Sequence, residues 1–210
     1  MSAGDVPQFD IVIVGCGLSG VVVAHNIRKD NPTLSYCILE RRSAVGGTWH
    51  LHTYPCIRSD SDAYTFSLPV DLLPWDPNSY KPLAAGATAT SAEKDKKTAE
   101  RWFGEGYELH HYIETAWRKV GADKHTIFNA KVDAMQWRSE EQRWTFDVSH
   151  CTDNANDDNA ASAPPPPRKI KSRFVYLAAG YYNYDQPLKP TYPGMDKPLN
   201  PPSLMRRVQF

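Results

Sequence analysis

The sequence predicts an α/β fold, a Rossmann-like parallel sheet that carries a small antiparallel β excursion. Three observations support this fold class. A continuous apolar run, FDIVIV, covers residues 9–14 and turns directly into glycines, as a strand buried on both faces of a parallel sheet does. Helical spacing follows over 18–29 and ends at Asn31-Pro32, because proline disfavours helix in the residue before it. A second apolar run, SYCIL at 35–39, completes a βαβ unit.

Further elements are expected in the second half of the chain. Apolar residues at helical spacing predict a helix over 105–120. Two of the expected strands form a hairpin, the antiparallel excursion, in which Trp137 and Trp144 face each other within the core. The expected strands are 126–130, 132–138, 144–148 and 173–178. Two low-complexity segments, 83–99 and 151–167, lack the means to bury a core and are expected to be disordered insertions.

Composition excludes several classes of protein. At 210 residues the chain suits one domain or two small ones, and 24 basic residues balance 24 acidic residues. This balance argues against a nucleic-acid surface and a polybasic membrane patch. No apolar run reaches about 18 residues, so no membrane segment is expected. The N-terminus lacks an apolar signal, and the four cysteines are scattered, so we expect reduced thiols and a cytoplasmic protein.

A glycine motif lies between the first strand and the first helix. Gly15, Gly17 and Gly20 form GxGxxG, which allows a tight turn, close approach of backbone to a pyrophosphate and close packing of helix on strand. Glu40 ends the second strand twenty positions after Gly20, where its carboxylate would accept hydrogen bonds from the ribose hydroxyls of a dinucleotide and repel a 2′-phosphate. FAD or NAD therefore fits better than NADP. The plain alternative is an ordinary turn followed by a surface glutamate.

A second glycine pair, Gly46-Gly47, precedes Thr48 and Trp49. Glycines here would let backbone pass close to a flavin diphosphate, which a plain NAD dehydrogenase does not require; a glycine turn with a core tryptophan is the alternative. The following segment, 54–66, is dense in polar and aromatic groups, and from residues alone it is either a pocket lining or, more often, a solvated loop. The histidine pairs at 50/52 and 110/111 lack supporting ligand spacing, so no metal site is expected.

Four segments taken together resemble a known family. FDIVIVGCGLSG, ILERRSAVGGTW, YPCIRSDSDAYTF and YLAAGYYNYD, in that order, are similar to class B flavoprotein monooxygenases. Within that class they most resemble Baeyer–Villiger monooxygenases of the ethionamide monooxygenase type. The resemblance implies FAD, NADPH and O₂ as reactants, and a small-molecule ketone or a sulfur or nitrogen compound as substrate.

The resemblance also implies roles for individual residues. Gly15, Gly17, Ser19 and Gly20 would hold the FAD pyrophosphate, and Glu40 the adenosine ribose. The residues along the flavin would be Gly47, Thr48, Trp49, His50 and Leu51, and Ala179 and Gly180 would form a second flavin contact. Asp60 would lie near the reactive edge of FAD, and Arg58 and Ser59 would lie towards the nicotinamide. Val132 would lie at the adenine. No catalytic residue is assigned. Ala179 stands where the family commonly has a hydroxyl-bearing residue, so backbone contacts alone are expected there.

The chain departs from the family pattern after Gly194. The family continues into a fingerprint histidine and a second GxGxxG that binds NADPH, whereas this sequence contains one such motif. We therefore expect an FAD-binding lobe over 1–194, a divergent tail over 195–210 and no NADPH domain. The lobe would be incomplete relative to the family, truncated and inactive alone. The alternative is a stand-alone, non-catalytic FAD- or nucleotide-binding module.

Overall fold

The computed structural model describes residues 6–76, 103–151, 168–184, 186 and 191–193. The expected insertions at 83–99 and 151–167, apart from Cys151, and the expected tail at 195–210 lie outside the described residues. The chain divides into two compact units, residues 1–180 and 181–210, and every element described below belongs to the first.

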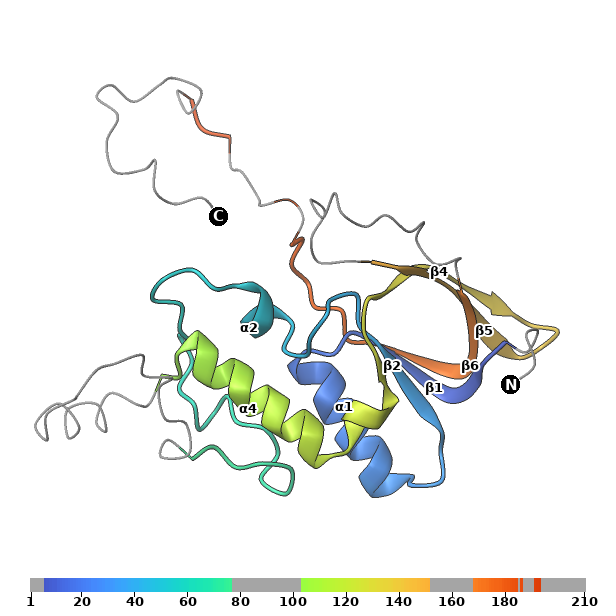
Figure 1. The fold of residues 1–210 in the computed structure, drawn as a ribbon, viewed down its shortest axis with the longest axis horizontal. Helices are drawn as coiled ribbons and strands as arrows, with labels where there is room; N and C mark the ends of the chain where they lie inside the picture. The colour runs from blue at the N-terminus through green and yellow to red at the C-terminus, as the bar shows by residue number, and fades with distance from the viewer. Residues whose placement is uncertain (1–5, 77–102, 152–167, 185, 187–190, 194–210) are drawn as a thin grey trace, which may run out of the picture. The chain divides into compact units, whose positions relative to one another are not determined.

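Six strands form one mixed sheet, which confirms the predicted α/β fold (Figure 1). Their order is β3-β2-β1-β6-β5-β4. The first four in this order run parallel to one another, whereas β5 is antiparallel to both of its neighbours. The strands are β1 (Gln8–Val14), β2 (Tyr36–Leu39), β3 (Thr126–Ile127), β4 (Ala130–Arg138), β5 (Arg143–His150) and β6 (Arg168–Leu177).

The antiparallel hairpin is continuous with the parallel sheet because β6 serves both. The first half of β6 pairs with β5, from Val148 opposite Arg168 to Trp144 opposite Ser172. Its second half pairs with β1, ending with Val14 opposite Leu177. The sequence prediction covered only this second half. The expected strand 126–130 was too long: it stops at Ile127, since Asn129 adopts a positive φ of 54° that breaks the ladder.

Helices α1 (Leu18–Asp30) and α4 (Gly106–Lys119) lie on one side of the parallel strands (Figure 1). Their apolar faces pack on Ile13 and Ile38 in the larger of two core clusters. The helix predicted over 105–120 is confirmed, and the four apolar residues whose helical spacing predicted it, Leu109, Ile113, Ala116 and Val120, are all buried. On α1 the sequence suggests Leu18, Val22 and Ile27 as candidates for the buried face; Ile27 is buried, whereas Leu18 and Val22 are half-buried. Val21 and Ala24 are the fully buried residues that were not among these candidates.

The opposite face of β1 and β2 is covered by the hairpin and the first half of β6. Val12 and Leu39 pack there against Phe146, Val148 and Ile170, so β1 and β2 are buried on both faces as their continuous apolarity predicts.

Some apolar side chains remain exposed. Trp137 lies opposite Trp144 as expected, but it is 43% exposed, so its assignment to the core was wrong. It lies near the tip of the hairpin, beyond the reach of β1. Phe174 and Tyr176 on β6 are 60% and 49% exposed. They pair with Ile11 and Ile13 and therefore share the helix side of the sheet, beside α1.

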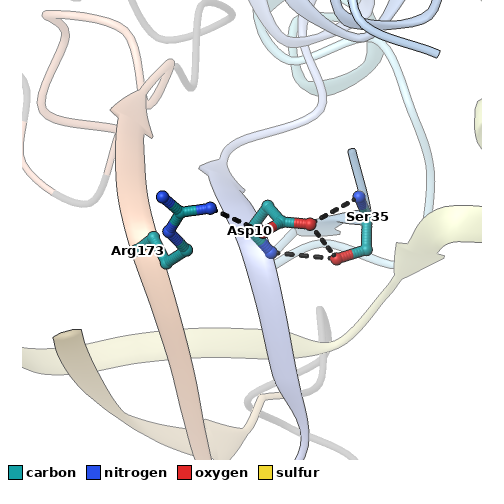
Figure 2. Close-up of polar contacts among 3 residues, drawn as sticks. All are labelled: Asp10, Ser35 and Arg173. Carbon is teal, nitrogen blue, oxygen red and sulfur yellow. Dashed lines mark hydrogen bonds and ion pairs between the residues drawn. The ribbon is translucent and has the colours of Figure 1, made fainter. Parts of the chain in front are cut away.

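Polar contacts of Asp10 link the beginnings of β1 and β2 and reach β6 (Figure 2). One carboxylate oxygen of Asp10 accepts hydrogen bonds from the backbone N–H and the hydroxyl of Ser35, at 2.9 and 2.7 Å. The other lies 3.4 Å from the Arg173 guanidinium on β6. The Ser35 hydroxyl and backbone amide lower the pKa of Asp10, because they stabilise its charged form, and Arg173 adds a smaller effect.

Candidate functional site

Three loops meet at the edge where the parallel strands end. The Gly15 amide bonds to Leu39 O at 2.8 Å, and the Ala178 amide bonds to Val14 O at 2.8 Å. The ends of β1, β2 and β6 therefore lie together. β1 lies between β2 and β6, so the strands that follow β1 in the sequence are placed on both sides of it. The strand order therefore reverses direction at β1. Nucleotides bind parallel sheets outside such a point.

The first glycine loop, residues 15–20, leaves no space for side chains at two of its glycines. Gly15 has a φ of +104°, and a Cβ on it would lie 2.5 Å from Ala178 O. A Cβ on Gly20 would lie 2.1 Å from Gly15 O. Gly17 is the N-cap of α1 and supplies no side-chain cap. The first backbone amides of the helix therefore follow a turn that is lined by backbone atoms. This is the geometry that receives a phosphate at a helix N-terminus.

Glu40 braces this loop from the end of β2. Its side chain is 6% exposed, and Oε2 accepts the Cys16 amide at 2.7 Å while Oε1 accepts the Arg42 amide at 2.8 Å. Each carboxylate oxygen can accept a further bond, so ribose hydroxyls would add to this arrangement. Burial, with a smaller contribution from the Glu40 charge, raises the pKa of the Cys16 thiol to about 12. The bracing role of Glu40 was not predicted.

The second glycine loop, residues 45–47, lies against the first. The Gly46 amide bonds to Cys16 O at 3.0 Å. A Cβ on Gly47 would lie 3.2 Å from the Cα of Gly17, so the two backbones are in close contact. Gly46 and Gly47 both have positive φ, 124° and 55°. A bulky residue at 17 or 47 would push the loops apart.

The short helix α2 (Thr48–Leu51) follows the second loop and carries the residues expected along a flavin. All four of its residues are half-buried. Trp49 packs edge-on against Phe66, with ring centroids 5.9 Å apart, and the ring of His50 lies 5.2 Å from that of His110. Phe66 comes from the polar and aromatic segment that the sequence left open, so this part of the segment packs next to α2.

Arg58, Ser59 and Asp60 lie on a separate stretch joined to the start of α4. The Ser59 amide bonds to Gly104 O at 2.9 Å, and Arg58 lies 3.6 Å from the Glu105 carboxylate. Ser59 is buried and its hydroxyl exchanges hydrogen bonds with the backbone of Ser61, whereas Asp60 is exposed. The contacts described here fix this stretch to α4 and do not join it to the glycine loops.

The remaining expected residues flank the loops on either side. Ala179 and Gly180 follow Ala178, whose carbonyl abuts Gly15, and Gly180 has a φ of +76°. Val132 lies on β4 opposite Val148, two residues after Ala130, whose amide bonds to Glu40 O at 2.8 Å. The structure thus gathers the two glycine loops, Glu40 and the 178–180 turn, with the start of β4 beside Glu40.

A shallow groove of about 410 Å³ lies beside these loops rather than between them. It is lined by α1, including Leu18, Ser19 and Val22, and by Tyr176 of β6. In the described ranges no group of three or more His, Cys, Asp or Glu side chains is placed to hold a metal ion. All four cysteines are free.

Among the helices that the structure describes, none is long and apolar enough to cross a bilayer.

These features define the class of the fold as a dinucleotide-binding Rossmann unit. The model of the NAD(P)-binding Rossmann-like domain matches residues 13–87. A solved structure of an oxidized steroid monooxygenase bound to NADP superposes with a TM-score of 0.59 at 21% identity, over 90% of this chain and 29% of that one. A polycyclic ketone monooxygenase from Thermothelomyces thermophila gives a TM-score of 0.59 at 19% identity, over 86% of this chain and 24% of that one. At these identities they show the shared fold.

Sequence relatives narrow the class. The FAD-containing monooxygenase EthA of Mycolicibacterium smegmatis is 36% identical over 189 residues, which are 90% of this chain and 31% of that protein. EthA of Mycobacterium tuberculosis strain H37Rv is 34% identical over 195 residues, 92% of this chain and 32% of that protein. Along most of its own length the chain is therefore similar to FAD-containing monooxygenases, and it spans about a third of the length of these relatives. The family resemblance predicted from the four segments is confirmed.

Proposed function

We propose that this chain is the FAD-binding part of an NADPH- and O₂-dependent monooxygenase that oxidises ketones by Baeyer–Villiger chemistry or oxygenates sulfur or nitrogen. The observation that carries the proposal is the contact between the two glycine loops beside a buried carboxylate. A single glycine loop suits any dinucleotide. A second one packed on it extends the backbone-lined surface, which suits the longer FAD molecule. The names of the relatives, which are FAD-containing monooxygenases, support this.

The residues present fit FAD. The first loop offers backbone amides and the uncapped N-terminus of α1 to the pyrophosphate. Glu40 would accept the adenosine ribose hydroxyls while still holding the first loop. The proposed FAD contacts are Gly15, Gly17, Ser19, Gly20, Glu40, Gly47, Thr48, Trp49, His50, Leu51, Val132, Ala179 and Gly180. FAD, when bound, would supply the redox chemistry by which electrons from NADPH reduce O₂, one oxygen atom entering the substrate and the other leaving as water.

Arg58 and Ser59 are proposed to face the nicotinamide of NADPH, and Asp60 is proposed to lie near the reactive edge of FAD. Their support is the family resemblance of the 54–66 segment and its firm attachment to α4 through Gly104 and Glu105. Arg58 is half-exposed, so its guanidinium is accessible to a phosphate or ribose group. The cytoplasmic location inferred from the scattered cysteines stays a prediction, supported by the four free thiols.

The first test is a titration of the purified chain with FAD and with NADP, followed by fluorescence quenching. FAD is expected to bind more tightly, because Glu40 repels a 2′-phosphate. Glu40→Ala should weaken FAD binding by about 1.5–3 kcal/mol, since charge-assisted hydrogen bonds to the ribose and to the Cys16 amide are both lost. Glu140→Ala, at the exposed hairpin turn, is the matched control and should leave binding unchanged. Tighter binding of NADP would refute the proposal.

A second candidate is a stand-alone FAD- or nucleotide-binding module without catalysis. The match of residues 13–87 to an NAD(P)-binding domain favours this alternative. An assay that can exclude this alternative follows NADPH oxidation with FAD, O₂ and a panel of ketones and thioethers. Because the sequence contains one GxGxxG, we expect the 210-residue chain to give no coupled turnover by itself. Oxygenated product above a no-enzyme control would contradict that expectation and exclude the non-catalytic module.

A further inference from the structure

A histidine on α4 reaches the second glycine loop from far along the chain. The ring of His110 lies with Nε2 2.9 Å from Val45 O, across 65 residues of sequence. A carbonyl oxygen can only accept, so Nε2 carries the proton and donates. The same ring abuts the next residue, because a Cβ on Gly46 would lie 2.5 Å from Cδ2 of His110. One side chain therefore contacts two consecutive residues of the loop.

The contact continues into the first glycine loop through the backbone. The Gly46 amide bonds to Cys16 O at 3.0 Å, and the Cys16 amide bonds to Glu40 Oε2 at 2.7 Å. A line of hydrogen bonds thus runs from α4 through both glycine loops to the carboxylate proposed to bind ribose. Val45 is 3% exposed, so its carbonyl would lose a partner inside the protein if His110 were removed.

Helix α4 is a firm support for this contact. It begins with a reciprocal capping box between Glu105 and Glu108. Leu109 and Ile113, which flank His110 on the helix, are fully buried in the larger core cluster. The His110 ring therefore projects from a fixed element, whereas two of the three residues of the second loop are glycines with positive φ and only Val45 packs a side chain in the core.

We infer that His110 is a positioning residue for the FAD site, which holds the second glycine loop in place against the first. This inference rests on the proposed FAD-binding function. His110 acts through Val45 and Gly46, by one hydrogen bond and one ring contact. The two contributions are separable, because phenylalanine keeps a ring and loses the donor, while glutamine keeps a donor and loses the ring.

The test compares His110→Phe, His110→Gln and His111→Phe in the full 210-residue chain. His111 is the next residue on α4 and is exposed, so it controls for added apolar surface. Three quantities are measured: the Kd for FAD by flavin fluorescence, the thermal midpoint, and amide hydrogen exchange at Gly46 and Ala178. The Ala178 amide, bonded to Val14 O in the sheet, is the internal control.

His110→Phe is expected to raise the Kd for FAD roughly 3–10-fold and to speed Gly46 exchange by a similar factor, with Ala178 exchange unchanged. His110→Gln should return the Kd for FAD and the Gly46 exchange rate most of the way to the values of the parent chain. His111→Phe should match the parent chain in both. Parent-like FAD binding and Gly46 exchange in His110→Phe would overturn the inference, as would a His110→Gln variant as impaired as His110→Phe. If the parent chain fails to bind FAD, the proposed function fails, and Gly46 exchange still decides whether His110 positions the loop.

Discussion

The two glycine loops of the site are held in different ways. The first is enclosed by its own residues and by the strand ends: Gly20 packs on Gly15, and Gly15 packs on Ala178, all through backbone atoms. The second depends on a side chain, His110, from a helix that begins almost sixty residues later. The first loop is therefore confined by backbone atoms of its own motif and of residue 178, whereas the second is confined by a side chain from α4. Substitutions at the two loops should behave differently for this reason.

The largest effect is expected from Gly20→Ala. Its Cβ would lie 2.1 Å from Gly15 O, a backbone atom that cannot move without displacing the start of α1. We expect a loss of about 3 kcal/mol or more of unfolding free energy, measured by urea denaturation followed by circular dichroism. Ser19→Ala, at the exposed neighbouring position, should change stability by less than about 0.5 kcal/mol. Equal stability of the two variants would show that the first loop is not tightly enclosed.

Gly46→Ala should have a smaller cost that a second substitution can relieve. The added Cβ meets the His110 ring at 2.5 Å, and the φ of +124° adds strain, so we expect a loss of about 1–3 kcal/mol. In a His110→Ala background the ring is gone, and the backbone strain and the close approach to His50 Cβ at 3.0 Å remain. A double-mutant cycle should therefore give a coupling energy of at least about 0.5 kcal/mol. Simple additivity would mean that His110 does not confine the loop.

The smallest effect concerns the opposite edge of the sheet, where Asp10 holds Ser35 (Figure 2). The pKa of Asp10 is lowered below its ordinary 3.8 in the folded chain. Its stabilising contribution is therefore complete above about pH 4 and is lost as the pH falls through the folded pKa. Asp10→Asn should lower the free energy of unfolding by about 1 kcal/mol at pH 6, a small value because Asp10 is partly exposed to solvent. The difference should become progressively smaller below pH 4.

Urea denaturation at a series of pH values measures this difference between the parent chain and Asp10→Asn. The same variant should leave FAD affinity unchanged, because Asp10 lies at the end of β1 away from both glycine loops. A constant difference from pH 6 to pH 3 would contradict the assigned role of the carboxylate.

The sequence could predict the elements whose signals are local. The β1 strand, α1 and α4 fall within one or two residues of expectation, because continuous apolarity, the glycine motif and helical spacing each act over a short range. The expected strand after residue 126 was too long because Asn129 turns the chain. The joining of the hairpin to the parallel sheet depends on β6, whose first half is rich in Lys and Arg and lacks an apolar strand signal.

The same division holds for the site. The GxGxxG motif, the Gly46-Gly47 pair and Glu40 were identifiable from residue type and spacing. Two features were not: Glu40 as a brace for the Cys16 amide, and His110 as the support of Val45. Both depend on contacts between segments distant in sequence, and a histidine on a helix gives no local signal of the carbonyl it will meet. The paired histidines at 110 and 111 were considered only as metal ligands.

The indoles of Trp137 and Trp144 form an edge-to-face pair, with centroids 5.7 Å apart and ring planes at 62°. Two such chromophores at this separation and in a fixed chiral arrangement share their excited states. The hairpin should therefore carry its own optical signature, a pair of oppositely signed ultraviolet dichroism bands that vanishes when either indole is replaced. Because this signal arises at the hairpin rather than at the glycine loops, melting of β4 and β5 can be followed separately from any change in a bound flavin.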